Sequence, residues 1–187
     1  MPTAERVLLV GRRADVLRRL ADALSRHGLH VRQETDVEQA CTELDGSKYD
    51  VLALGRGVVG TKRDSLISAL RARNPSLRVV DGLAPITALQ EAQVQEALGP
   101  PAGWDRIVAS AWLDPGDERV VLSLRRPADV TVELFRLDLL YRAHEQRLHS
   151  GRLDAGRHVL PKRVRFRRAE RFLVVRADGQ TSVHPIN

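Results

Sequence analysis

The first half of the chain alternates short apolar runs with amphipathic stretches. The apolar runs have strand length and end in glycine or turn residues, whereas the amphipathic stretches repeat apolar residues at helical spacing. The pattern predicts strands at 6–11, 29–33, 51–54 and 77–80, and helices at 14–28, 37–44, 61–73 and 85–98. Because strands that alternate with helices form parallel sheets through right-handed crossovers, we expect an α/β domain over residues 1–98.

Local signals predict where these helices begin and end. Asp36 is placed to cap the second helix, and Thr61 with Asp64 forms a capping box for the third. Gly28 is a stop signal after the first helix, and Pro85 lies near the start of the fourth.

Beyond residue 98 the period changes from helical to alternating. Residues 99–103 (GPPAG) are the expected linker. Strand-like runs follow at 106–112, 119–124, 130–135, 158–159, 164–166 and 172–175, separated by turn signals. For 137–149 a strand-turn-strand interpretation is preferred to a helix. This spacing predicts a small all-β sandwich over 104–187, although 106–112 could belong to either domain.

Composition narrows the chemistry. Charged residues are 29% and hydrophobic residues 43%, which is ordinary for a globular protein. The single cysteine, Cys41, excludes an internal disulfide, and the chain has no CxxC or Cys/His cluster for zinc. The first apolar run is too short for a signal peptide or a membrane span. We therefore expect a cytoplasmic protein with no membrane partner, no metal and no cofactor.

The loop after the third predicted strand is rich in glycine. Gly55, Gly57 and Gly60 match the dinucleotide-binding fingerprint, and Asp81 ends the next predicted strand near the offset of a ribose contact. However, the fingerprint normally follows the first strand of a domain, and this α/β half is too short for a second mononucleotide-binding unit. Nucleotide binding is therefore the alternative, and a glycine-rich turn without a carboxylate, His, Ser or Cys is the preferred interpretation.

Most of the +6 net charge lies in the second half, where Arg157–Arg171 contains seven basic residues and one acid. Clustered arginines favour nucleic acid through counterion release, but no helix-turn-helix or aromatic platform accompanies them. An acidic protein surface, or a strand face kept soluble by charge, explains the segment at least as well. We expect the two tryptophans near the linker to pack the two domains together, although an exposed pair would instead mark a binding hot spot. The candidate interaction residues are Trp104, Trp112, Arg163, Arg165, Arg167 and Arg168.

Residues 5–98 resemble the receiver domain of two-component response regulators. The segments that carry the resemblance are RVLLVGRR, YDVLALGRGVVG and NPSLRVVDGLAP. It implies a flavodoxin-like parallel sheet with flanking helices. Gly11 and Arg12 replace the family's acidic pair, Gly55 replaces its phosphoryl-accepting aspartate, and its fifth strand with the lysine is not evident. The missing strand means that the domain is truncated or borrows RIVAS from beyond the linker.

Receiver phosphorylation needs a carboxylate nucleophile and a Mg²⁺ held by further carboxylates. The resemblance, with these departures, therefore implies a degenerate pseudo-receiver that is not phosphorylated.

The second half resembles the immunoglobulin-like domain of flagellar hook-capping and secretion-sorting proteins. The segments that carry this resemblance are VVLSLRRPADVTVELFRLD, LDAGRHVL and ERFLVVRADG, with Leu139-Leu140 in place of the usual glycine turn. Such domains act in assembly or sorting and not in catalysis.

Together these patterns predict a non-catalytic regulatory or scaffolding protein that binds a protein partner independently of phosphorylation. The partner would have an acidic surface or be a second copy of the chain. The alternatives are a nucleotide-responsive regulator that uses the Gly55–Gly60 loop and a nucleic-acid-associated protein that uses the basic strands 157–171.

Overall fold

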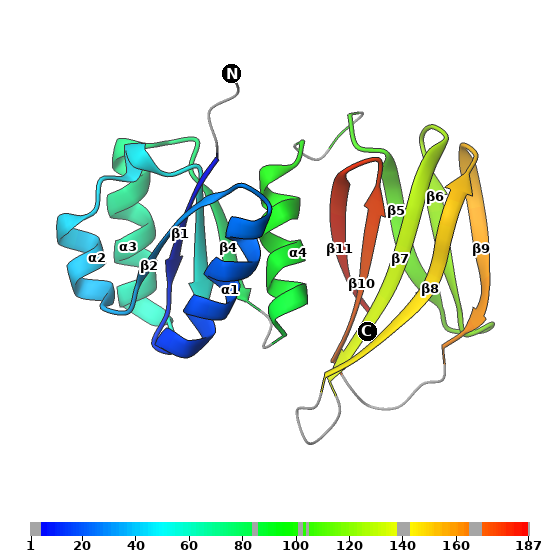
Figure 1. Ribbon diagram of the computed structural model, residues 1–187, viewed down its shortest axis with the longest axis horizontal. Helices are drawn as coiled ribbons and strands as arrows, with labels where there is room; N and C mark the ends of the chain where they lie inside the picture. Colours follow the sequence, from blue (N-terminus) through cyan, green and yellow to red (C-terminus); the bar gives the residue numbers. More distant parts are fainter. Residues whose placement is uncertain are drawn as a thin grey trace. The chain divides into compact units, whose positions relative to one another are not determined.

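The computed structural model (Figure 1) describes residues 5–83, 86–100, 103, 105–137, 143–164 and 170–186. The chain divides into two compact units, Met1–Leu98 and Gly99–Asn187. Within the described residues, no helix combines the length and the apolar character needed to cross a bilayer.

The first unit is built on a parallel sheet with the strand order β2-β1-β3-β4. Strands and helices alternate along the chain, as the sequence predicts. The strands are β1 (Arg6–Val10), β2 (His30–Glu34), β3 (Val51–Gly55) and β4 (Arg78–Leu83). The helices are α1 (Ala14–Arg26), α2 (Val37–Glu43), α3 (Gly60–Arg73) and α4 (Thr87–Leu98), with a 3-10 turn, η1, at Gly46–Lys48.

Helices cover both faces of this sheet. Successive residues of a strand point to opposite faces of the sheet. The apolar side chains of β1 and β3 therefore contribute to two separate cores, one on each face. Leu8 and Leu52 pack in a cluster with residues of α2 and α3, whereas Val7 and Val51 pack in a second cluster with residues of α1 and α4. Burial on both faces explains why these strands are apolar throughout.

The predicted cap of α2 is confirmed, and the predicted capping box of α3 is wrong. The Oδ1 atom of Asp36 accepts hydrogen bonds from the backbone N–H groups of Glu38 (2.8 Å) and Gln39 (3.1 Å). Helix α3 begins at Gly60, with no side-chain hydrogen bond at its N-cap. Gly60 has a φ of 64°, which allows the helix to begin before Thr61, and Thr61 is therefore already inside the first turn.

The second unit contains two antiparallel sheets, with the orders β11-β10-β7-β8 and β5-β6-β9. The strands of the first sheet are β7 (Ala128–Leu137), β8 (Ala143–Leu153), β10 (Glu170–Ala177) and β11 (Gln180–Ile186). Those of the second are β5 (Val108–Asp114), β6 (Arg119–Leu124) and β9 (Gly156–Arg163). Both sheets contribute to one apolar core, in which Leu122 of β6 and Leu134 of β7 are fully buried. The predicted alternation of core-facing and outward residues is confirmed.

Three expectations need correction. Strand β11 was missed because its sequence, QTSVHPI, mixes polar residues with a proline. Val164, expected in a strand, lies just beyond the end of β9, and residues 165–166 are outside the described part. Finally, the RIVAS segment does not complete the parallel sheet. Most of it forms the start of β5, which pairs antiparallel with β6 in the second unit. The expectation of a strand rather than a helix is confirmed for residues 143–149, which lie in β8. Residues 138–142 are not among the residues that the structure describes.

Candidate interaction surfaces

The carboxyl ends of β1 and β3 lie at one edge of the parallel sheet, called here its crest. Ligands of α/β proteins usually bind at this edge. Two glycine backbones meet at this crest. A Cβ atom added at Gly55 would lie 3.5 Å from the Cα atom of Gly11, which is ordinary contact. The side chains that could reach a ligand here therefore come from Arg12 and the following loop. Neither strand end carries a carboxylate.

Arg12 occupies the space above the glycine-rich loop. A Cβ atom at Gly57 would lie 3.3 Å from Cδ of Arg12, so the missing side chain at position 57 makes room for the arginine. This arrangement gives Gly57 a packing role in the fold. It also places a side chain where a pyrophosphate group would approach the loop backbone.

Asp81, the predicted ribose contact, is held by Arg63. The Nε atom of Arg63 donates to Oδ2 of Asp81 at 2.6 Å, and a second guanidinium nitrogen lies 2.5 Å from the same oxygen. Arg63 also donates to Asp64 at 2.6 Å. The hydrogen bonds that Arg63 donates, first to Asp81 and then to Asp64, raise the pKa of its guanidinium above the ordinary value. A sugar hydroxyl would have to compete with this pair for Asp81.

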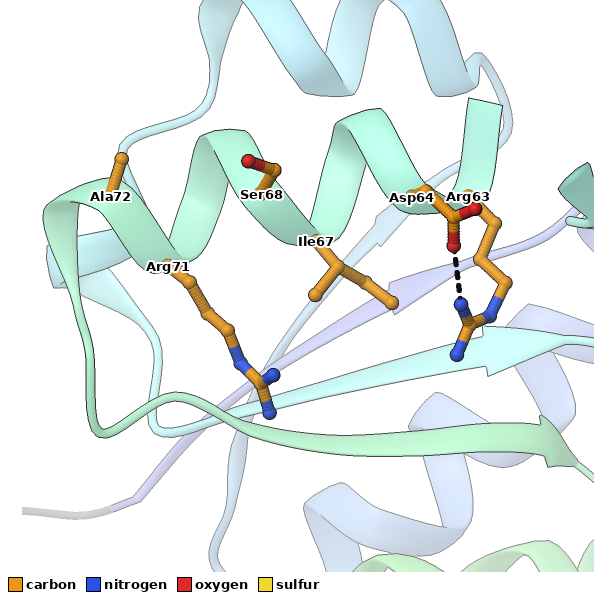
Figure 2. Close-up of a pocket in the computed structure, with 6 residues that line it drawn as sticks. All are labelled: Arg63, Asp64, Ile67, Ser68, Arg71 and Ala72. Carbon is orange, nitrogen blue, oxygen red and sulfur yellow. Dashed lines mark hydrogen bonds and ion pairs between the residues drawn. The ribbon is translucent and has the colours of Figure 1, made fainter. Parts of the chain in front are cut away.

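A shallow groove of about 550 Å³ runs along α3 (Figure 2). Arg63 and Arg71 frame it, and Ile67, half-buried and in contact with the core, lies between them. The Nε atom of Arg71 donates to the carbonyl oxygen of Leu77 at 3.4 Å, just before β4 begins. The groove was not predicted from the sequence, although the four-residue spacing of these three side chains places them on one helix face.

An exposed apolar and basic patch lies on the outer face of the three-stranded sheet. Ala111 and Leu113 face the core, so Trp112 between them points outward, and it is 39% exposed. Across the strands, Trp112 pairs with Val121, and Val121 pairs with Val159, which is 49% exposed. We call Trp112, Val121, Arg157 and Val159 the Trp112 patch.

Arg157 stacks on the tryptophan. Its guanidinium carbon lies 5.5 Å from the centroid of the Trp112 ring, within the range of a cation–π contact. Val121, directly opposite Trp112, is only 1% exposed. Trp112 and Arg157 therefore lie beside a buried position of β6, and Trp112 remains partly exposed.

Among the remaining predicted interaction residues, Arg163 alone lies within the described part of the chain. Arg163 is the last residue of β9, opposite Arg119 in the strand register. Trp104, Arg165, Arg167 and Arg168 lie outside the described residues. Val159 was missed as a site residue, and Arg157 was included only in the basic segment 157–171 of the nucleic-acid alternative. The alternation of Arg157, His158 and Val159 could have indicated that Arg157 and Val159 share an outward face.

No protein-family model, curated protein or solved structure matches this chain.

A charged cluster links three strands of the four-stranded sheet in the second unit. Glu133 of β7 is buried, and its carboxylate accepts hydrogen bonds from Arg147 of β8 (3.2 Å) and Arg176 of β10. Burying an unpaired carboxylate costs free energy, and the hydrogen bonds from the two arginines offset this cost for Glu133. This is a structural role, since both carboxylate oxygens already have partners.

Metal-binding clusters and the single cysteine bear on the chemistry available to this chain. The described residues contain no group of three or more His, Cys, Asp or Glu side chains close enough to hold a metal ion. Partial burial, followed by the nearby Glu38 charge, raises the pKa of the Cys41 thiol. A raised pKa lowers the thiolate fraction at neutral pH, which makes Cys41 a poor nucleophile.

Proposed function

We propose that the protein is a non-catalytic regulatory or scaffolding protein of the cytoplasm that binds a protein partner through the Trp112 patch. The proposal includes a degenerate receiver with a flavodoxin-like fold in the first unit and an immunoglobulin-like sandwich in the second. The strand order and the helices on both sheet faces support the former, and two antiparallel sheets around one core support the latter. The observation that carries the function is the exposed Trp112 ring stacked by Arg157.

Tryptophan and arginine are the side chains most enriched at interface hot spots. Here the arginine is already positioned on the ring in the free protein, so less side-chain freedom is lost on binding. The patch contains one cation and no acid among its four residues, which favours a partner that places a carboxylate against Arg157. Val159 adds apolar area beside the ring.

Substitutions in the Trp112 patch should weaken capture of the partner. Trp112→Ala removes the anchor, and loss of a hot spot costs about 2 kcal/mol or more, which is roughly a 30-fold drop in affinity. Arg157→Glu should weaken capture comparably, whereas Arg157→Lys, which keeps the charge, should weaken it less. The measurement is quantitative capture of partners from the native cell extract on immobilised variants.

Arg18→Glu is the matched control, because Arg18 is exposed on α1 and the substitution makes the same charge change in the other unit. Circular dichroism establishes that each variant is folded. If Trp112→Ala and Arg157→Glu retain the same proteins in the same amounts as the unchanged chain, the Trp112 patch is not the binding site.

Phosphorylation should not occur on the first unit. Incubation with acetyl phosphate and Mg²⁺ is expected to leave the intact mass unchanged, because Gly11, Arg12 and Gly55 supply no carboxylate to accept the phosphoryl group or hold the ion. An active receiver treated in parallel provides the positive control. A labile phosphoryl adduct on this chain would refute phosphorylation independence.

Neither alternative function gains a specific contact among the described residues. Asp81 is engaged by Arg63, and Arg12 covers Gly57, which counts against a nucleotide at the glycine-rich loop. For nucleic acid, three of the four candidate arginines lie outside the described part of the chain.

A further inference from the structure

Strand β5 lies at an edge of the three-stranded sheet, since among the described residues it pairs with β6 alone. The backbone N–H of Arg125 donates to the carbonyl oxygen of Ile107 at 2.9 Å, so these two residues form a hydrogen-bonded antiparallel pair. Bonded and non-bonded pairs alternate along the ladder, and the bulge in β5, which counts as one position, is followed by a regular stretch that begins at Ser110. In that stretch the backbone N–H and C=O groups of Ala111 and Leu113 therefore point away from β6, toward the open edge.

The regular stretch of β5 lacks the features that usually keep edge strands from pairing, which are charged side chains, prolines and bulges. The other outer strands of the two antiparallel sheets have them. Pro161 of β9 and Pro185 of β11 are exposed, and β8 carries exposed charges such as Glu145. Between its bulge and Asp114, β5 has the sequence SAWL, with neither a charge nor a proline. It is therefore the outer strand of this unit that is best suited to pair with another strand.

We infer that β5 pairs antiparallel with β5 of a second copy of this chain, about a two-fold axis at Trp112. Ala111 of each copy then lies opposite Leu113 of the other, and each of these pairs exchanges two backbone hydrogen bonds. The axis is perpendicular to the sheet, so the two three-stranded sheets join edge to edge and their Trp112 patches lie on one face. The inference rests on the proposed function, because it names a second copy as the partner of this patch. The start of β5, where the N–H of Ile107 donates to Gln180 of β11, stays outside the pairing.

The side chains of the regular stretch are complementary to those of a second copy. Trp112 lies opposite Trp112 in a non-hydrogen-bonded pair, whose Cα atoms come to about 4.5 Å, and aromatic pairs of this kind stabilise antiparallel sheets. On the same outward face, Ser110 of each copy lies opposite Asp114 of the other, so the serine hydroxyl can donate to the carboxylate. The Oδ1 atom of Asp114 accepts from the backbone N–H of Gly116 at 2.9 Å, and the serine can use Oδ2.

Charge complementarity also favours a second copy as the occupant. In the strand register Ser110 lies opposite Ser123 of β6, and Ser123 lies opposite Arg157 of β9. Asp114 of the second copy therefore extends a cross-strand row that ends in Arg157. The second copy supplies the acid that the Trp112 patch lacks, and the two-fold symmetry repeats this arrangement on the other side.

Sedimentation velocity on the purified full chain over the micromolar range tests the pairing. We expect a species of twice the 20.8 kDa chain mass. Ser110→Glu places a carboxylate opposite Asp114 at both symmetric positions and should raise the dissociation constant at least about tenfold. Ser123→Glu makes the same change one strand further from the axis and should leave the dimer intact. Ser110→Lys, which places a cation opposite Asp114, should also retain it.

Cysteine cross-linking reads the register directly. In a Cys41→Ser background, Trp112→Cys places two thiols opposite each other at the axis, at a Cα separation that a disulfide spans, so mild oxidation should give a covalent dimer. Val159→Cys is the control, because Val159 is exposed on the same face two strands away. It should remain a monomer on a non-reducing gel.

A purified chain that stays monomeric at every concentration would overturn the inference, and so would equal dissociation constants for Ser110→Glu and Ser123→Glu. If partner capture from the cell extract still depended on Trp112, the proposed function would survive that result. If circular dichroism shows that Ser110→Glu is unfolded, the cross-linking decides. Equal cross-linking of Trp112→Cys and Val159→Cys would refute an axis at Trp112.

Discussion

Replacing Gly46 with alanine is expected to destabilise the first unit by about 3 kcal/mol or more. Gly46 begins η1, directly beneath the last turns of α3. A Cβ atom there would lie 2.1 Å from the carbonyl oxygen of Leu70 and 2.9 Å from its Cα atom. These are backbone atoms of a helix, so no side-chain rotation relieves the overlap. The end of α3 is also fixed, because Nδ2 of Asn74 donates to the carbonyl oxygen of Tyr49 at 2.8 Å.

Urea unfolding followed by far-ultraviolet circular dichroism measures this effect, because the α-helices of the described chain all lie in the first unit. Gly55→Ala is the control. Its added Cβ atom would come no closer than 3.5 Å to a neighbour, so we expect a change below about 1 kcal/mol. Unfolding of Gly46→Ala at the same urea concentration as the unchanged protein would show that η1 does not pack under α3 as described.

Truncating Leu122 to alanine should cost about 2–5 kcal/mol, the usual range for a cavity in a closed core. Leu122 lies on the central strand of the three-stranded sheet, is 0% exposed and packs in the cluster to which both antiparallel sheets contribute. Since the cavity opens between two packed sheets, the surrounding backbone has little freedom to close it.

Tryptophan fluorescence during urea unfolding reports on this substitution, because Trp104 and Trp112 both belong to the second unit. Val159→Ala serves as the control. It also removes apolar atoms, but Val159 is 49% exposed on the neighbouring strand β9, so the expected change stays below about 1 kcal/mol. Comparable losses for the two variants would mean that the two sheets do not share a closed core.

The strands and helices of the first unit were predictable because burial determines them locally. The runs at 6–11 and 51–54 are apolar on both faces, short and bounded by glycine or turn residues, as expected for strands inside a parallel sheet. The start of α3 was not predictable from its capping motif, because the positive φ of Gly60 fixed it. Likewise, β11 has no apolar alternation, and its pairing with β10 makes it a strand.

The interaction surfaces depend on strand order, which local patterns do not contain. Trp112 was a candidate from its residue type, but its stacking with Arg157 follows from the placement of β6 between β5 and β9. The place of β4 at the end of the described parallel sheet follows from the strand order in the same way. The alternating pattern predicted that these strands exist but not which strands are neighbours.

The packing of Arg12 over Gly57 has a consequence for any attempt to engineer a metal site into the first unit. An aspartate introduced at position 55 would stand two residues from the position that the Arg12 side chain packs against. A guanidinium this near would compete with a divalent cation for the new carboxylate. A single substitution at position 55 would therefore be insufficient, and Arg12 would have to be replaced as well.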